Sequence, residues 1–183
     1  MGEAKDGAGV AICFELVVNF GDNIDAARAA VLSCSRTSGR GPLGVGDHQI
    51  PLHAPLLRTD GPFIELSILP VAVGFGVALD GTVPRFALTA AELTALGNHL
   101  YELLAAFDGY VAATVGWDPE WMIDPAELKR EWFDEPGEAS PHGLVLSEAT
   151  HAELGLGDGS IVFQPGYRWI PYRGESPSTL TAD

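Results

Sequence analysis

The sequence predicts an α+β fold, in which an antiparallel sheet carries helices on one face as a ferredoxin-like split βαβ core and a C-terminal α/β elaboration follows. Three observations support this prediction. Apolar residues recur at helical spacing over residues 93–107, so one side of that helix must be buried. An almost unbroken apolar run follows at 110–117 and is typical of a strand covered on both faces. Up to Trp117 the patterns run strand, helix, strand, strand, helix, strand, which is the split βαβ order.

The core begins with a strand rich in Val, Ile and Phe at residues 10–20. A turn follows, where Asp22 or Asn23 is placed to cap a helix that runs to about Ser35. The inner face of this helix is expected to contain Ile24, Ala27, Val31 and Cys34.

Two segments in the middle of the core are interrupted by proline. Residues 48–58 form a plausible strand, which Pro51 and Pro55 shorten or confine to a sheet edge. The apolar run 63–79 is divided by Pro70, so it is either two strands or one bent strand.

The second helix of the core has clear signals at both ends. Thr89 and Glu92 have the spacing of a capping box, in which each side chain satisfies a free amide of the first turn. Asp108-Gly109 ends the helix, because glycine adopts the left-handed conformation that closes a helix. The apolar stripe between these signals consists of Leu93, Leu96, Leu100, Leu103 and Phe107.

The composition changes after Trp117, where the C-terminal elaboration is predicted to begin. Its elements are a helix from Pro125 to about Phe133 with Asp124 as N-cap, a short strand at 143–146, a short helix capped by Ser147 that runs to Leu154, and a hairpin of 161–163 with 167–172. We expect a single domain over 1–183, with the core at about 10–117, the elaboration at about 118–173 and a disordered Ser/Thr/Pro-rich tail at 174–183.

The net charge of −15 over 183 residues narrows the possible functions. It disfavours direct contact with nucleic acid or with an anionic membrane, since both are negative, and it permits a basic protein partner. A second interpretation stays open. In this interpretation the charge reflects only solubility in an acid-rich proteome, because Lys5 and Lys129 are the only lysines.

The chain is expected to be cytoplasmic. Its first residues lack a basic segment followed by an apolar run, so no signal peptide is predicted. No apolar window is long enough to span a membrane. The two cysteines, Cys13 and Cys34, are expected to be buried free thiols, since a secreted disulfide framework would use more.

The sequence contains no catalytic signature, and we predict no catalytic residue, no cofactor and no metal. His48 and His53 would face opposite sides of an irregular strand. His99 and Glu102 share a helix face, but a bundle metal site needs several such pairs, so a solvated or hydrogen-bonded histidine is the better interpretation. The Gly-rich segment 35–46 is expected to be a plain loop, because it lacks the strand-to-helix context of a phosphate loop.

One tract, residues 118–138, combines acids with aromatics. It contains eight acids against two bases, and three of the four Trp residues border or occupy it. Large rigid aromatics dominate binding hot spots, and carboxylates around them steer a basic partner. The alternative is that the acids form a solvated helix face and the Trp residues belong to the core, which is what we expect of Trp117.

A second aromatic group lies on the last hairpin strand, at Tyr167, Trp169 and Tyr172. It fits an interface and an edge strand closed off by Pro171 equally well. A homo-oligomer that uses this strand is a further possibility.

The segment around Trp117-Asp118-Pro119 carries a resemblance to a known family. A compact α+β core that ends in Trp-Asp-Pro-Glu-Trp, followed by a short helix and a Gly-Leu-Val-Leu-Ser strand, resembles the immunity proteins of bacterial polymorphic toxin systems. The resemblance covers residues 60–172 in pattern. It implies a small, acidic, cytoplasmic protein that protects a cell by binding and blocking a cognate toxin.

We therefore expect a non-enzymatic binding protein, an immunity-type inhibitor that blocks a basic toxin surface by steric and charge complementarity. The residues expected to contact the partner are Trp121, Asp118, Glu120, Asp124, Glu127, Glu131, Tyr167 and Trp169. The alternative is a small-molecule-binding or enzymatic ferredoxin-like domain with a pocket between the sheet and the elaboration, lined by His99, Glu102 or Arg85.

Overall fold

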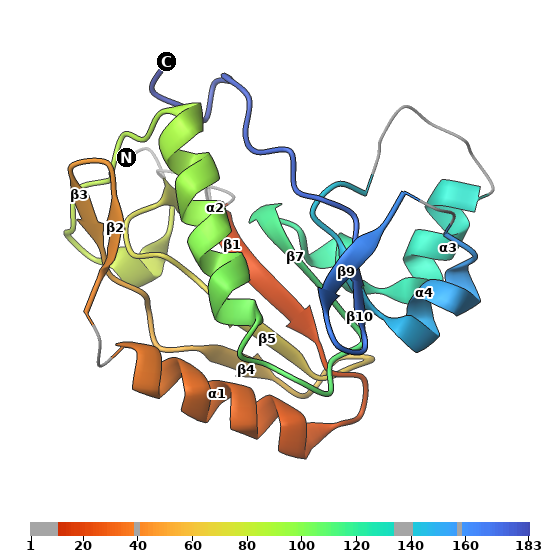
Figure 1. Cartoon of the computed structure of the whole chain (residues 1–183). Coiled ribbons are helices and arrows are strands. Elements are labelled where there is room, and N and C mark those ends of the chain that lie inside the picture. The colour runs from red at the N-terminus through yellow and green to blue at the C-terminus, as the bar shows by residue number, and fades with distance from the viewer. Residues whose placement is uncertain (1–10, 39–40, 134–140, 157–158) are drawn as a thin grey trace, which may run out of the picture.

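The computed structural model describes residues 11–38, 41–133, 141–156 and 159–183, with side chains except at positions 37, 38, 78, 121 and 131–133. One large antiparallel sheet organises the described chain (Figure 1). Its strands lie in the order β4–β5–β1–β7–β8–β10–β9, and β6 pairs with one end of β1. The bounds are β1 Ile12–Asn19, β4 Leu56–Arg58, β5 Glu65–Ile68, β6 Gly74–Phe75, β7 Ala112–Trp117, β8 Val145–Ser147, β9 Ile161–Gln164 and β10 Tyr167–Trp169.

The first four strands of this order form the predicted split βαβ core. β1 leads into α1 (Ile24–Ser38), and α2 (Ala90–Leu104) leads into β7, which returns to the side of β1 opposite β5. Both helices cover the same face of the sheet (Figure 1). The prediction of an α+β fold with an antiparallel sheet is therefore confirmed.

The two faces of β1 have different environments. Phe14, Leu16 and Val18 are buried in the larger core with α1 and α2. The alternate residues, which include Glu15 and Val17, point to the other face because side chains alternate along a strand. All of these residues are buried, so β1 is the central strand of the domain.

Local capping signals set the starts of both core helices as predicted, whereas α2 ends at Leu104 and not at the predicted Asp108-Gly109. The Glu92 amide donates to Thr89 Oγ1 at 3.2 Å, and the Thr89 amide donates to Glu92 Oε2 at 2.9 Å, so the capping box of α2 is confirmed. Asn23, rather than Asp22, caps α1, because its Oδ1 accepts from the Ala26 amide at 3.1 Å.

Pro70 divides the apolar run into two strands, β5 and β6, which both pair with β1. Leu16 faces Ile68 and Cys13 faces Gly74, so three steps along β1 correspond to six steps along its partner. The three extra residues form a bulge, within which Ala72 has a φ of 60°. Both β5 and β6 therefore pair with β1 in the same direction.

The prolines at 51 and 55 break the strand expected over 48–58. Its first part, β3 (His48–Ile50), pairs with β2 (Leu43–Val45) in a separate two-stranded sheet. Its last part is β4, which lies at the edge of the large sheet. A proline cannot donate to a ladder of hydrogen bonds, so the run does not continue through it.

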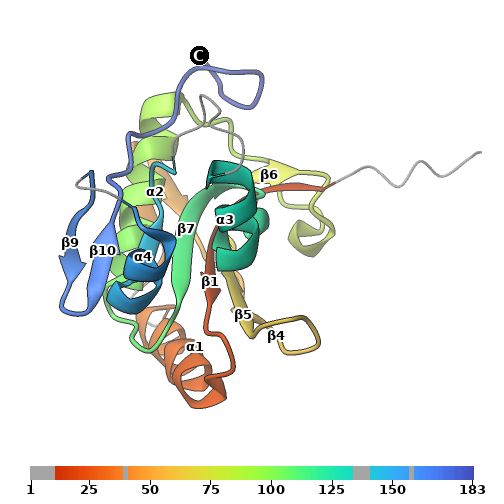
Figure 2. The same cartoon turned by 90° about the vertical axis from the view of Figure 1, so that its right-hand side faces the viewer.

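The elaboration covers part of the second sheet face (Figure 2). The short helix η2 (Glu120–Ile123) is followed by α3 (Pro125–Phe133), and α4 (Glu148–Leu154) is capped by Ser147 as predicted. Together they bury a smaller core that consists of Val17, Ala112, Ile123, Leu128, Leu144, Leu146 and Leu154. Every helix in the described part of the chain is too short or too polar to span a membrane.

The segment after β10 has no helix or strand but packs against α2 (Figure 1). The Glu175 amide donates to Thr94 Oγ1 at 2.8 Å, and the Ala182 amide donates to the Leu88 carbonyl at 2.8 Å. The composition of residues 174–183 predicted a disordered tail, but the structure packs this segment against α2. The composition could not indicate these contacts, because their partners lie far away in the sequence.

A tyrosine hydroxyl joins α2 to the sheet and to the elaboration, which gives a test of the packing. Tyr101 Oη donates to the Gly143 carbonyl at 2.7 Å and accepts from the Val115 amide at 3.2 Å, and the residue is buried. We expect Tyr101→Phe to lower the free energy of unfolding by about 1–3 kcal/mol, because it leaves two buried backbone groups without a partner.

Chemical denaturation followed by circular dichroism measures this loss. Tyr172→Phe is the matched control, since Tyr172 Oη donates to the half-buried Glu175 carboxylate, which water can reach after the change. Equal stability of Tyr101→Phe and wild type would contradict the packing described here.

Candidate binding pocket

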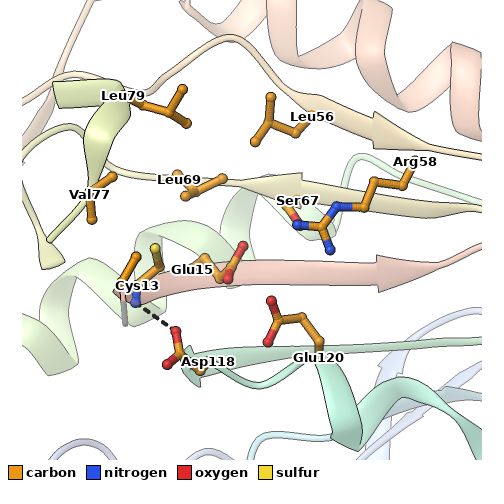
Figure 3. Close-up of a pocket in the computed structure, with 11 residues that line it drawn as sticks. Cys13, Glu15, Leu56, Arg58, Ser67, Leu69, Val77, Leu79, Asp118 and Glu120 are labelled. Atoms are coloured by element: carbon orange, nitrogen blue, oxygen red, sulfur yellow. Dashed lines mark hydrogen bonds between the residues drawn. The ribbon is translucent and has the colours of Figure 1, made fainter. Parts of the chain in front are cut away.

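A pocket of about 400 Å³ lies on the second sheet face, beside the part that the elaboration covers (Figure 3). Its floor consists of side chains from β1, β4 and β5, and its walls come from the segments around η1 (Ala78–Asp80) and η2. The lining residues are Ala11, Cys13, Glu15, Leu56, Arg58, Ser67, Leu69, Val77, Leu79, Asp118 and Glu120.

Three carboxylates from three different elements meet at this pocket. Glu15 comes from β1, Asp118 follows β7, and Glu120 begins η2. The Glu15 and Glu120 side chains point toward one another in the close-up (Figure 3). The topology therefore concentrates negative charge at one point of the sheet face.

Asp118 is held by β1. Its Oδ1 accepts from the Cys13 amide at 2.7 Å, and its own amide donates to the Cys13 carbonyl at 2.9 Å. Its φ of 43° is left-handed, a conformation that Asp tolerates better than most residues. These contacts fix the carboxylate at the pocket wall.

Glu15 lies at the floor with 4% of its surface exposed. The Ser67 hydroxyl lies beside it and favours its charged form, but the hydrogen bond of that hydroxyl goes to Glu65 Oε1 at 3.3 Å. Arg58 also binds Glu65, at 3.0 Å. Among the described residues, the Glu15 carboxylate therefore has no cation as a partner, and the one hydroxyl beside it donates to Glu65.

The pKa values of two pocket groups reflect this arrangement. Burial, followed by the charges of Glu120, Glu65 and Asp118, raises the pKa of the Glu15 carboxyl to about 7. Burial, followed by the charges of Glu15 and of the acids around it, raises the pKa of the Cys13 thiol to about 11. Burial and the neighbouring acids thus favour the neutral form of both groups.

The pocket also has an apolar side. Leu56, Leu69, Val77 and Leu79 lie across the floor from the two acids at its other wall (Figure 3). Leu79 is 55% exposed, which is unusual for a large aliphatic side chain. A ligand in this pocket would meet carboxylates on one side and aliphatic carbon on the other.

A metal ion is one ligand that the residues could hold. The ligand atoms of Cys13, Glu15 and Asp118 lie within 4.8 Å of one another. A metal would need the thiolate form of Cys13, which the surrounding acids disfavour as long as no cation is bound. We predicted no metal from the sequence, and this cluster is the one place in the described residues that could hold one.

The structure brings together two of the predicted contact residues, Asp118 and Glu120. Two others have local roles in α3: Asp124 Oδ1 accepts from the Ala126 amide at 2.9 Å, and Glu127 pairs with Arg130 at 3.4 Å. The side chains of Trp121 and Glu131 lie outside the described residues.

The predicted role of Tyr167 and Trp169 as partner contacts needs correction. Tyr167 is buried, stacks on Tyr110 with ring centroids 4.0 Å apart and donates to Asp108. Trp169 packs on Tyr101 and against Phe163. Their strand, β10, lies between β8 and β9 and is not an edge, so it offers no free strand for a homo-oligomer either.

The other candidate residues have structural partners. His99 lies within hydrogen-bond distance of Glu102 and of the Gly44 carbonyl, as expected of a hydrogen-bonded histidine. Trp117 is half-buried and packs on Phe14 against the core, although it was predicted to belong to the core. Arg85 lies over the Phe75 ring at 3.7 Å, so neither it nor the His99–Glu102 pair lines the pocket described here.

Sequence reasoning missed Glu15, Cys13 and Ser67 as pocket residues. One signal was available: Glu15 is the only charge in the apolar run of the first strand, and a carboxylate in such a run needs a polar site in the fold. Cys13 was expected to be buried, but it is half-buried and lines the pocket, whereas Cys34 is buried as expected.

Comparison of the chain with protein-family models, with curated proteins and with solved structures found no match to any of them. The interpretation of the pocket therefore depends on its own geometry and charge.

The raised pKa of Glu15 predicts a pH-dependent stability. Between pH 4.5 and about 7 the folded chain holds a proton that the unfolded chain has lost, so the free energy of unfolding falls as the pH rises through this window. The fall attributable to Glu15 is roughly 3 kcal/mol. Glu15→Gln removes it, so the variant is expected to be more stable than wild type at pH 8 and similar to it at pH 4.5.

Denaturation at both pH values measures the difference between the variant and wild type. Glu153→Gln is the control, because Glu153 is exposed on α4. A constant difference between Glu15→Gln and wild type across the window would show that Glu15 ionises normally.

Proposed function

We propose that this chain is a binding protein whose acidic pocket face engages a basic protein partner, and that it acts as a cytoplasmic immunity-type inhibitor. The observation that carries the proposal is the convergence of Glu15, Asp118 and Glu120 on one pocket of the open sheet face. Arg58 is the only cation among the residues that line it, and it is already paired with Glu65.

Charge complementarity supports this function. The net charge of −15 raises the association rate with a basic partner, and the local excess of carboxylates fixes where that partner docks. A stable interface buries on the order of 1,600 Å² in total, which is more than the pocket alone offers. The acids at the start of α3, Asp124 and Glu127, lie on the same side of the sheet and would belong to the wider interface.

The immunity-type class adds a mechanism to this binding. The proteins that the segment Trp117-Asp118-Pro119 resembles bind a toxin. By analogy, this chain would cover the basic surface of a toxin and so block the access of the toxin's substrate. The structure gives the tripeptide a physical role, since Trp117 packs on Phe14 against the core and Asp118 joins β7 to β1 at the pocket wall.

A second candidate is a small-molecule-binding domain. The volume of about 400 Å³ is within the range of ligand sites, and the pocket borders the elaboration as that alternative expected. The polar groups of the pocket are almost all acids, so such a ligand would be cationic.

Charge changes at the pocket wall test the proposed function. The partner is isolated from the native host on immobilised wild-type chain, and its affinity is then measured by calorimetry. We expect Asp118→Asn/Glu120→Lys to weaken binding by at least about tenfold, because it removes attraction and adds repulsion. In cells that express the partner, the same variant should lose protection of growth.

The matched control is Glu102→Gln/Glu153→Lys, which changes the net charge by the same amount at exposed positions on α2 and α4. Equal affinity of the pocket variant and the control would remove the pocket from the interface. A captured partner without a basic surface would contradict the charge argument itself.

A further inference from the structure

We propose that the pocket receives one lysine or arginine side chain of the protein partner, with its cationic end among Glu15, Asp118 and Glu120 and its aliphatic stem on the leucine side. This inference rests on the proposed function, because it names the chemical group that the basic partner inserts. It thereby replaces a general charged face with a defined binding site for one side chain.

The first argument is the state of Glu15. Its carboxylate is buried, points into the pocket and has neither a cation nor a donor of its own among the described residues. Burial of an ionised carboxylate is costly unless it is paired. The arrangement is therefore complete only when a cation enters from outside.

The second argument is the number of acceptors. Ionised carboxylates accept hydrogen bonds and donate none, and the three acids offer more acceptors than the Cys13 amide and the Ser67 hydroxyl can satisfy. An ammonium carries three donors and a guanidinium five. Either group would bridge Glu15 on the floor and Glu120 on the wall, whose side chains already point toward one another.

The third argument is the apolar side of the pocket. Leu56, Leu69, Val77 and Leu79 form a surface for methylene groups opposite the acids. Lysine and arginine side chains bury their stems on such surfaces while the charged end reaches polar groups. A bare metal ion on Cys13, Glu15 and Asp118 would leave this side unused, so the observations favour the side chain.

The pH dependence of binding follows from all the groups around Glu15. These are Cys13 on its own strand, Glu65 and Ser67 on β5, Arg58 on β4, Asp118 after β7, Glu120 on η2, and Asp80 on η1, which acts through Cys13. Burial, followed by the charges of the surrounding acids, raises the pKa of Glu15 to about 7. A cation that needs ionised Glu15 should bind about tenfold more tightly at pH 8 than at pH 6.

The experiment uses capped amino acids as probes of the full chain, without the partner. N-acetyl-arginine amide and N-acetyl-lysine amide are titrated against the isotope-labelled protein, and the amide signals of Cys13, Glu15 and Ser67 are followed by NMR. The neutral isosteres, N-acetyl-citrulline amide and N-acetyl-norleucine amide, are the ligand controls. We expect the cationic probes to shift these signals and the neutral probes to bind at least about tenfold more weakly.

Variants locate the binding. Glu15→Gln should weaken the cationic probes by at least about tenfold and abolish their pH dependence, whereas Glu153→Gln should change neither. Because Glu15→Gln is expected to be stable at pH 8, a loss of binding there does not reflect unfolding, and its spectrum verifies the fold.

Four outcomes would overturn the inference. One is binding of the cationic and neutral probes with equal affinity. Another is displacement of the probes by Zn²⁺ at equimolar protein, which would assign the pocket to a metal. The third is that agmatine, a small free cation, binds at least a hundredfold more tightly than the capped amino acids. That result would assign the pocket to a small molecule. Partner binding that depends on Asp118 and Glu120 without any probe binding would overturn this subsite and leave the proposed function intact.

Discussion

The pairing of β1 with β5 on one side and β7 on the other is the constraint on which the rest of the structure depends. It satisfies the backbone of β1 in both directions and buries every residue from Phe14 to Asn19. Since the side chains alternate, one face of β1 belongs to the helices and the other face must find different neighbours. The position of the pocket depends on which elements cover each part of that second face.

The elaboration covers only half of the second face. Asn19 Nδ2 donates to the Ile123 carbonyl at 2.7 Å, which anchors the end of η2 on β1, and Val17 joins the smaller core beneath it. Among the described residues, no helix covers the other end of β1, with Cys13 and Glu15. The same anchor positions Glu120 at the rim, so the contact that completes the fold also completes the acidic pocket.

Features with local causes could be predicted from the sequence. The capping box at Thr89 and Glu92 and the helix capped by Ser147 depend on neighbouring residues, and they are as predicted. The predicted split βαβ order is present as β1, α1, β4, β5, α2 and β7, but β2 and β3 were not predicted as separate strands, and β6 was one of two alternatives. Features that depend on distant partners could not be predicted in this way. The bulge after Pro70 exists because β5 and β6 share β1, and the burial of Tyr167 exists because it stacks on Tyr110.

The candidate site shows the same division. Asp118 and Glu120 were found because they lie in an acid-rich tract, but closeness along the chain does not imply a shared pocket, and Asp124 and Glu127 have partners in α3 and do not line it. Glu15 was missed because a strand covered on both faces is a nearly continuous apolar run in the sequence. Such a run does not show which face of the strand borders a pocket. The floor of the pocket is thus a property of the tertiary structure.

The hydrogen bond from the Cys13 amide to Asp118 Oδ1 has a consequence for observing the pocket. It ties a backbone proton of the central strand to a carboxylate whose charge the pocket's occupant would share. Deuterium uptake at this single amide therefore depends on whether the cavity is filled, even for an occupant that touches no main-chain atom. Exchange of the Cys13 amide would therefore report whether the pocket is occupied, at the end of β1 that no described helix covers.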